Sequence, residues 1–285
     1  MIGELYNCKP TLNDKQVLDF CYQGFLKFEA VVPDEVNRRT VEFCNEHAHG
    51  EPSGILDQAW FDQYVIKNEQ AASAVRCLLS KNFQLPSIMS NHRNRCPWPA
   101  QNWHRDGGSI YTRQLNYLQV FYYPEDTPPE MGPTEIVPGS HFARHKATYM
   151  QHMRGISSAT STAAPAGTIF ITAYGIWHRR SKSTASGIRN LLKYNYWRTT
   201  KPCRDWIIDP DFSFSWPEHD PHPMFEQFKR GIAAVEMFSW LCGEDYEHVG
   251  GQCWPAECTT PPRWDQAGLP AGLRKYPDPT PTTLP

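Results

Sequence analysis

The 285-residue sequence lacks long apolar runs, a surplus of one charge and regularly spaced cysteines. No apolar run approaches the roughly 20 residues of a membrane-spanning helix, and residues 1–10 have no basic region followed by an apolar core, as a secretory signal would. The 28 basic and 30 acidic residues leave a formal charge of −2, so the charge does not favour nucleic acid or an anionic membrane as a partner. Nine cysteines without a framework spacing are typical of reduced thiols. We therefore expect a cytoplasmic protein.

Helices are expected mainly in the first third of the chain. Residues 11–24 carry capping signals at both ends: Asn13 has Gln16 three positions on, and Gly24 is a typical helix stop. Apolar residues recur at helical spacing in each predicted segment. The predicted helices cover residues 11–24, 33–47 and 68–82.

From residue 85 onward, proline and glycine punctuate short runs of β-branched and aromatic residues, as in strands. Several short strands without helices between them favour a sandwich or barrel. Strands are predicted over residues 87–95, 114–123, 134–137, 168–172 and 189–197, and an amphipathic helix over residues 223–242. We expect one mainly β domain with flanking helices over residues 1–285, divided into a helical buttress (11–84), a β core (85–198) and a C-terminal helix with a proline-rich extension (199–285).

Residues 102–108, Asn-Trp-His-Arg-Asp-Gly-Gly, place an imidazole and a carboxylate two positions apart. On a strand, side chains at i and i+2 leave the same face, so His104 and Asp106 can converge on one point. A His nitrogen and an Asp oxygen are two of the three ligands of a common iron site, which a second His completes. The pair alone is weak evidence, because His-x-Asp also occurs by chance in surface turns.

Two downstream segments strengthen this interpretation. A β-rich run over residues 167–178 ends at His178, and Arg189 follows 11 positions later (189 − 178). Between the two motif histidines, residues 131–141 read Met-Gly-Pro-Thr-Glu-Ile-Val-Pro-Gly-Ser-His. Its glycines and prolines indicate turns, and we interpret the terminal His141 as structural.

Together these motifs resemble the phytanoyl-CoA dioxygenase-like (PhyH) family of iron(II)/2-oxoglutarate-dependent oxygenases, over about residues 11–198. The resemblance implies a double-stranded β-helix core, also called a jelly roll or cupin-like fold. It implies that His104, Asp106 and His178 bind iron(II). Arg189 matches the arginine that binds the distal carboxylate of 2-oxoglutarate, and dioxygen is the other cosubstrate. Gln119, on the strand after the first ligand pair, is a further predicted cosubstrate contact.

The chemistry of these residues agrees with the resemblance. Two neutral imidazoles and a carboxylate leave three positions of an octahedron open for a 2-oxo acid and dioxygen. The far carboxylate of the 2-oxo acid is then buried, and a buried anion requires a charged partner. An arginine suits this task because its planar fork binds a carboxylate bidentately and stays protonated.

One position departs from the family pattern. The second residue after the distal histidine is often small and hydroxylic in the family, whereas this chain has Arg180 there. The secondary contacts to the cosubstrate are therefore open, with Ser181 or Ser183 as possible substitutes.

We expect hydroxylation of a C–H bond, with release of succinate and CO2. Desaturation, epoxidation and rearrangement use the same chemistry and stay open, as does the oligomeric state, for which a homodimer is one possibility. A jelly-roll protein that binds a metal without turnover, or a zinc hydrolase, would not need Arg189. Aromatic side chains near the motifs are predicted to form an apolar pocket for a small lipophilic molecule: Trp98, Trp103, Tyr111 and Trp177.

Overall fold

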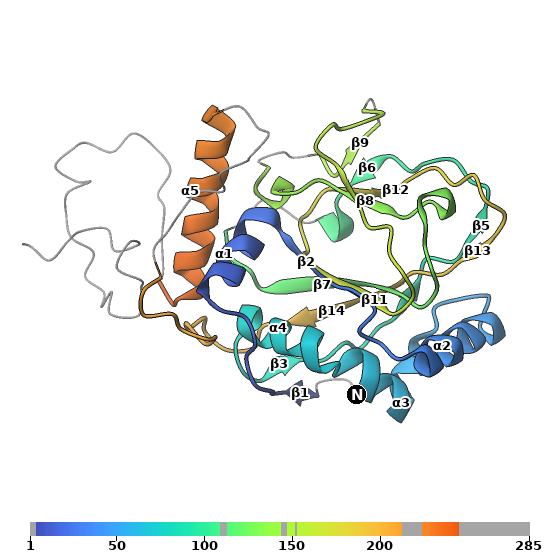
Figure 1. The fold of residues 1–285 in the computed structure, drawn as a ribbon, viewed down its shortest axis with the longest axis horizontal. Coiled ribbons are helices and arrows are strands. Elements are labelled where there is room, and N and C mark those ends of the chain that lie inside the picture. The colour runs from blue at the N-terminus through green and yellow to red at the C-terminus, as the bar shows by residue number, and fades with distance from the viewer. Residues whose placement is uncertain (1–3, 109–112, 144–146, 152, 213–223, 245–285) are drawn as a thin grey trace, which may run out of the picture.

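The computed structural model describes residues 4–108, 113–143, 147–151, 153–212 and 224–244. Two antiparallel sheets form the centre of the molecule, and helices cover the outer side of the larger one (Figure 1). No helix in the described part is long and apolar enough to cross a membrane. The fold is therefore mainly β with flanking helices around a jelly-roll core whose sheets do not close, which confirms the predicted fold class.

The strands of the described residues are β1 (Leu5–Tyr6), β2 (Phe25–Phe28), β3 (Phe83–Gln84), β4 (Ser90–Asn91), β5 (Asn94–Cys96), β6 (Trp103–His104), β7 (Tyr117–Tyr123), β8 (Thr134–Ile136), β9 (Tyr149–Met150), β10 (Thr160–Ser161), β11 (Thr168–Ala173), β12 (His178–Arg180), β13 (Gly187–Arg189) and β14 (Leu192–Trp197). The larger sheet has the order β1-β3-β14-β7-β11-β2, with β4 paired to β14. The smaller sheet has the order β10-β8-β12-β6-β9, and β13 pairs with β5.

The helices are α1 (Asp14–Gln23), α2 (Asp34–Glu46), α3 (Ala59–Phe61), α4 (Glu69–Leu79) and α5 (Met224–Leu241). The predicted capping box of α1 is present, because Asn13 and Gln16 exchange side-chain and backbone hydrogen bonds. Gly24 ends the helix in the left-handed conformation, as predicted. In Figure 1, α4 runs beneath the larger sheet and α5 stands beside α1.

The larger sheet separates two kinds of interior. On β7, Leu118, Val120 and Tyr122 point toward the helices and join the main hydrophobic core. Phe121 and Tyr123, which alternate with them, point into the roll and join a small second cluster. β11 and β14 alternate in the same way, so helices stabilise one face of the sheet while the other face surrounds the interior between the sheets.

Three segments differ from the sequence prediction. The strand predicted over residues 87–95 is divided into β4, which pairs with β14, and β5, which pairs with β13. The strand predicted over residues 189–197 is interrupted: Arg189 ends β13, which pairs with β5, and β14 then pairs with β7. The side chain of Asn190 holds the chain at this change of partner, since it accepts a hydrogen bond from Asn91 and donates one to Glu125. Residues 53–66, where no element was predicted, form a 3-10 turn (Ser53–Asp57), the short α3 and a π-helix (Asp62–Ile66).

Candidate functional site

The structure brings His104, Asp106 and His178 together between the sheets. β6 and β12 pair antiparallel with the two histidines directly opposite each other, and their ring centroids are 4.4 Å apart. One potential ligand atom from each of the three residues lies within 4.8 Å of the others. Segments 74 positions apart in sequence (178 − 104) thus supply one compact donor set.

The local path to Asp106 differs from the expected one. The strand ends at His104, and Asp106 opens a 3-10 turn, Asp106–Gly108. Within this turn Gly107 has φ +61°, and an added Cβ would clash with the hydroxyl of Tyr174. The turn therefore needs glycine at position 107 for its backbone shape and for space. His104 lies at the end of a strand and Asp106 in the turn that follows. The two side chains therefore do not converge as residues i and i+2 of one strand, as the sequence predicted.

Hydrogen bonds orient both imidazoles toward the carboxylate. Nδ1 of His104 lies 2.9 Å from the carbonyl of Asn102, and Nδ1 of His178 lies 3.1 Å from the carbonyl of Ile176. A carbonyl accepts only from a protonated nitrogen, so each Nε2 is left with its lone pair. Both Nε2 atoms lie 3.5 Å from Asp106 oxygens. Burial lowers the pKa of His104, which favours the neutral, ligating form. This donor set fits a divalent iron ion.

Lys193 is a site residue that the sequence reading missed. It lies on β14 with only 7% of its surface exposed, and its ammonium group contacts Oδ2 of Asp106. Its Nζ is also 3.4 Å from Nε2 of His178 and 5.2 Å from the centre of the Phe121 ring. The spacing in the sequence could have identified it. Arg189, Leu191 and Lys193 follow one another at intervals of two residues, as side chains on one face of extended chain do, and all three line the same pocket.

Gln119 also forms a hydrogen bond with the carboxylate of Asp106. Its amide Nε2 donates to Oδ2 of Asp106 at 2.7 Å. Gln119, which was predicted to contact the cosubstrate, therefore contacts Asp106, a candidate iron ligand. Burial alone would raise the pKa of Asp106, but hydrogen bonding to His178 and the adjacent Lys193 ammonium lower it below the ordinary value. Asp106 is therefore an anion throughout the neutral range.

A narrow pocket extends from the histidines to Arg189. The guanidinium of Arg189 is 2% exposed and donates from Nη1 to the carbonyl of Gly132. His92 also lines the pocket, and burial lowers its pKa to about 3. The lining residues are His92, Asn94, Gln101, His104, Phe121, Thr134, His178, Arg180, Arg189, Leu191 and Lys193.

The sequence model of the phytanoyl-CoA dioxygenase (PhyH) family matches residues 20–190, more than half of the chain. The chain belongs to the phytanoyl-CoA dioxygenase family. It is accordingly a 2-oxoglutarate-dependent non-haem iron oxygenase, with iron(II) as cofactor and 2-oxoglutarate and dioxygen as cosubstrates. No curated protein matches the chain in a sequence search.

Solved structures of similar fold agree with this assignment. HygX from Streptomyces hygroscopicus, with nickel and 2-oxoglutarate bound, is 15% identical, with a TM-score of 0.54 over 69% of this chain and 90% of that chain. The epimerase SnoN, in complex with Fe3+, α-ketoglutarate and nogalamycin RO, is 12% identical, with a TM-score of 0.51 over 65% and 83%. The carbocyclase SnoK is 17% identical, with a TM-score of 0.51 over 67% and 87%. At these identities the likeness concerns the fold.

Of the four aromatic residues predicted for the substrate pocket, the three described ones do not line the pocket beside the histidines. Trp103 and Trp177 are buried, but Trp103 packs under the Arg179 guanidinium and Trp177 under that of Arg105. Trp98 is 54% exposed. Tyr111 lies outside the described residues. Side chains that precede a ligand on a strand face away from it, which explains the position of Trp103.

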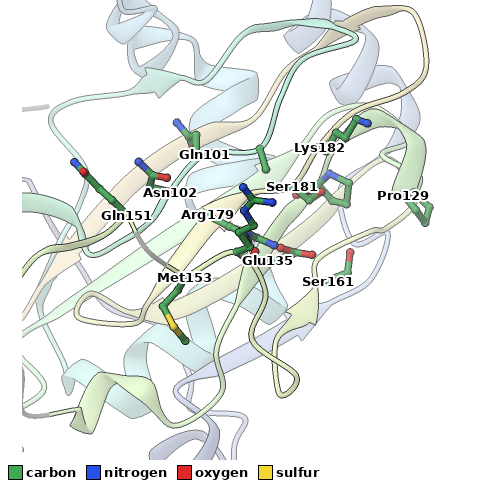
Figure 2. Close-up of a pocket in the computed structure, with 13 residues that line it drawn as sticks. Gln101, Asn102, Pro129, Glu135, Gln151, Met153, Ser161, Arg179, Ser181 and Lys182 are labelled. Atoms are coloured by element: carbon green, nitrogen blue, oxygen red, sulfur yellow. Dashed lines mark hydrogen bonds and ion pairs between the residues drawn. The ribbon is translucent and has the colours of Figure 1, made fainter.

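A second depression lies on the outer face of the smaller sheet. It has a volume of about 710 Å³, and Arg179 and Glu135 form an ion pair of 2.6 Å at its floor (Figure 2). β12 alternates, so Arg179 faces this outer cleft while His178 and Arg180 face the inner pocket of the oxygenase. Gln101 lines both cavities and thus forms part of the wall between them.

Proposed function

We propose that this oxygenase hydroxylates a C–H bond of a small organic metabolite, with release of succinate and CO2. His104, Asp106 and His178 hold the iron, and Arg189 binds the distal carboxylate of 2-oxoglutarate. The observation that carries the proposal is a compact donor set of two imidazoles and one carboxylate, whose two imidazoles line the same small pocket as the buried Arg189. Iron(II) bound there supplies the activation of dioxygen, driven by oxidation of 2-oxoglutarate.

The chain's own residues hold these groups in place. The backbone carbonyls of Asn102 and Ile176 fix the two imidazoles in the tautomer that binds a metal through Nε2. Gln119 and Lys193 both contact Oδ2 of Asp106, so they fix the rotation of the carboxylate and compensate its charge. Arg189 supplies the positive charge that a buried carboxylate requires.

The donor set and the pocket also limit the choice of reaction and substrate. A carboxylate at position 106 takes the place that a halide would need, which argues against halogenation. The epimerase and carbocyclase among the similar structures keep rearrangement as the alternative to hydroxylation. The expectation of a lipophilic substrate rested on four aromatic residues, and the described ones do not line the pocket beside the histidines. We therefore propose a small molecule without assigning it a lipophilic character.

The test is release of succinate from 2-oxoglutarate by the iron-loaded protein, even without a primary substrate. We expect slow, uncoupled succinate formation by the unaltered chain and none by His178→Ala. Arg189→Leu should raise the 2-oxoglutarate concentration needed by roughly 100-fold or more while iron stays bound, because the distal carboxylate loses its bidentate partner. Arg179→Leu, on the outer face of β12, is the matched control and should behave like the unaltered chain.

Two results would overturn the proposal. No succinate from a folded, iron-loaded protein would favour a jelly-roll protein that binds a metal without turnover. An unchanged 2-oxoglutarate requirement in Arg189→Leu would refute the assignment of the anchor.

A further inference from the structure

Two arginines lie in the inner pocket. Arg180 and Arg189 both line it, with 9% and 2% of their surfaces exposed. None of the described residues that line this pocket is acidic. Each guanidinium is a permanent charge, so two of them in one enclosed space repel each other unless an anion lies between or beside them.

The strand pairing brings the two guanidinium groups to the same end of the pocket. Arg180 is the third residue of β12, and its Nη1 donates to the side chain of Asn94. Asn94 is the direct cross-strand partner of Arg189 in the pair of β13 with β5. Arg189 in turn donates to the carbonyl of Gly132, two residues before Thr134, which pairs with Arg180. Each of the two arginines is thus tied, by its side chain or by strand pairing, to the same two short segments.

The hydrogen-bond partners of Arg180 are neutral. Its Nη2 donates to the carbonyl of Pro99 at 2.8 Å, and its backbone exchanges hydrogen bonds with Gln101. The Nε atoms of both Arg180 and Arg189 are buried and have no hydrogen-bond partner among the described residues. Neutral acceptors hold the outer ends of the Arg180 fork, but they leave its charge uncompensated and one donor unused.

The hydroxyl groups of the two serines that follow Arg180 are already engaged. Ser181 Oγ donates to the carbonyl of Pro133 at 2.8 Å. Ser183 Oγ accepts from the backbone amide of Trp98 at 2.7 Å. Neither serine therefore replaces the hydroxyl that the family often carries at position 180. The large cation at that position takes up the space beside Arg189 instead.

We propose that Arg180 and Arg189 together form a two-arginine site for the distal carboxylate of a 2-oxo dicarboxylate. The inference rests on the proposed function, in which Arg189 is the anchor, and adds Arg180 as a second positioning residue. Two cations around one carboxylate make the site selective for 2-oxo acids with a second carboxylate over those without one. The mutual repulsion of the guanidinium groups is relieved only when the carboxylate is bound, which strengthens its binding.

The experiment is calorimetric titration of the nickel-loaded protein with 2-oxoglutarate and, in parallel, with 2-oxobutyrate, which has no distal carboxylate. The variants are Arg180→Gln, Arg180→Lys and Arg189→Leu, with Arg179→Gln on the opposite face of β12 as matched control. We expect Arg180→Gln to weaken 2-oxoglutarate binding at least about tenfold and to leave 2-oxobutyrate binding unchanged. Arg180→Lys should restore most of the loss because it keeps the charge, and Arg179→Gln should change neither ligand.

Other outcomes separate the two proposals. If Arg189→Leu weakens 2-oxoglutarate binding and Arg180→Gln does not, Arg180 is structural and this inference fails while the proposed function stands. If neither variant weakens it, the anchor assignment itself fails. Equal weakening of both ligands by Arg180→Gln would also overturn the inference, because it would mean a general change of the pocket. If Arg180→Gln does not fold, Arg180→Lys decides: 2-oxoglutarate binding as weak as in Arg189→Leu refutes a role for the charge.

Discussion

The two faces of the larger sheet are built from the same three strands yet have opposite characters. On the helix side, β7, β11 and β14 contribute aliphatic and tyrosine side chains that pack on α1 and α4 within one large core. On the inner side, the same strands contribute Gln119, Lys193 and the small cluster around Phe121. Burial is nearly complete on both faces, so exposure alone does not distinguish them.

The difference shows where this fold places stability and where it places chemistry. Apolar burial on the helix side stabilises the sheet at about 25 cal/mol per Å². The inner face instead buries charges, which cost free energy unless partners compensate them. A rigid, helix-backed sheet can hold such charges in a fixed geometry. Substitutions on either face test how independent the two faces are.

The largest effect is expected from Asp106→Ala. The variant removes the only carboxylate of the donor set and leaves the Lys193 ammonium beside two imidazoles. We expect nickel binding to weaken more than 100-fold and succinate release to disappear, since even residues behind the ligands contribute 10–100-fold. Circular dichroism should still show a folded protein, because the helix-side core is untouched. Retention of metal affinity within about tenfold would show that the donor set is misassigned.

A large effect of a different kind is expected from Ile171→Ala. Ile171 is fully buried on the helix side of β11, so the variant creates a cavity in the main core. Urea unfolding should show a loss of about 2–5 kcal/mol in the free energy of unfolding. Nickel affinity at a temperature where the variant is folded should stay within about threefold of the unaltered chain. A larger change in affinity would mean that the two faces are coupled.

Much of this architecture follows from periodicity and capping in the sequence. Capping at Asn13 and Gly24 predicted the ends of α1, and runs of β-branched and aromatic residues between prolines and glycines predicted β7 and β11. The donor set was predictable because His104 and Asp106 are close in sequence. His178 and Arg189 came from a family resemblance, since nothing local shows that a strand end 74 residues away meets the first histidine (178 − 104).

The parts that escaped prediction depend on long-range contacts. Lys193 looks like an ordinary charged residue until β14 is placed beside β7, where its ammonium meets Asp106. The aromatic residues beside the ligands suggested a pocket, but strand alternation turns Trp103 away from it. The irregular segment over residues 53–66 has no helical period to detect. Sequence patterns identify the elements, whereas the partner of a buried charge depends on the tertiary pairing.

A moderate effect is expected from Lys193→Met. A positive charge in contact with Asp106 repels a divalent metal at the same carboxylate, whereas Gln119 keeps the carboxylate oriented. We expect nickel to bind roughly tenfold more tightly to Lys193→Met, measured by calorimetry, a change of about 1.4 kcal/mol. Lys182→Met, in the outer cleft, is the matched control and should bind nickel like the unaltered chain. Weaker nickel binding in Lys193→Met would mean that the ammonium chiefly orients Asp106.

An effect that appears only at acidic pH is expected from His141, a histidine outside the inner pocket. Its Nε2 donates to the carbonyl of Cys21 at 3.0 Å, and burial together with the nearby Arg230 lowers its pKa to about 3. Above pH about 6.5 the imidazole is neutral in the folded and unfolded chains alike, so it adds no pH dependence. Below pH about 6.5, His141 binds a proton in the unfolded chain but stays neutral in the folded chain until the pH approaches 3. Stability therefore falls with pH from about 6.5 toward 3, by up to about 1.4 kcal/mol per pH unit.

The variant His141→Gln keeps a donor for the Cys21 carbonyl and removes the titrating group. Between pH about 6.5 and 5, the unaltered chain should lose up to about 2 kcal/mol more unfolding free energy than the variant, measured by urea unfolding of both proteins without metal. All other groups are common to both proteins, so their contributions cancel in the difference. An equal loss in both proteins would mean that His141 is accessible to protons in the folded state. A histidine on the helix side would then not be the inert structural group that its burial indicates.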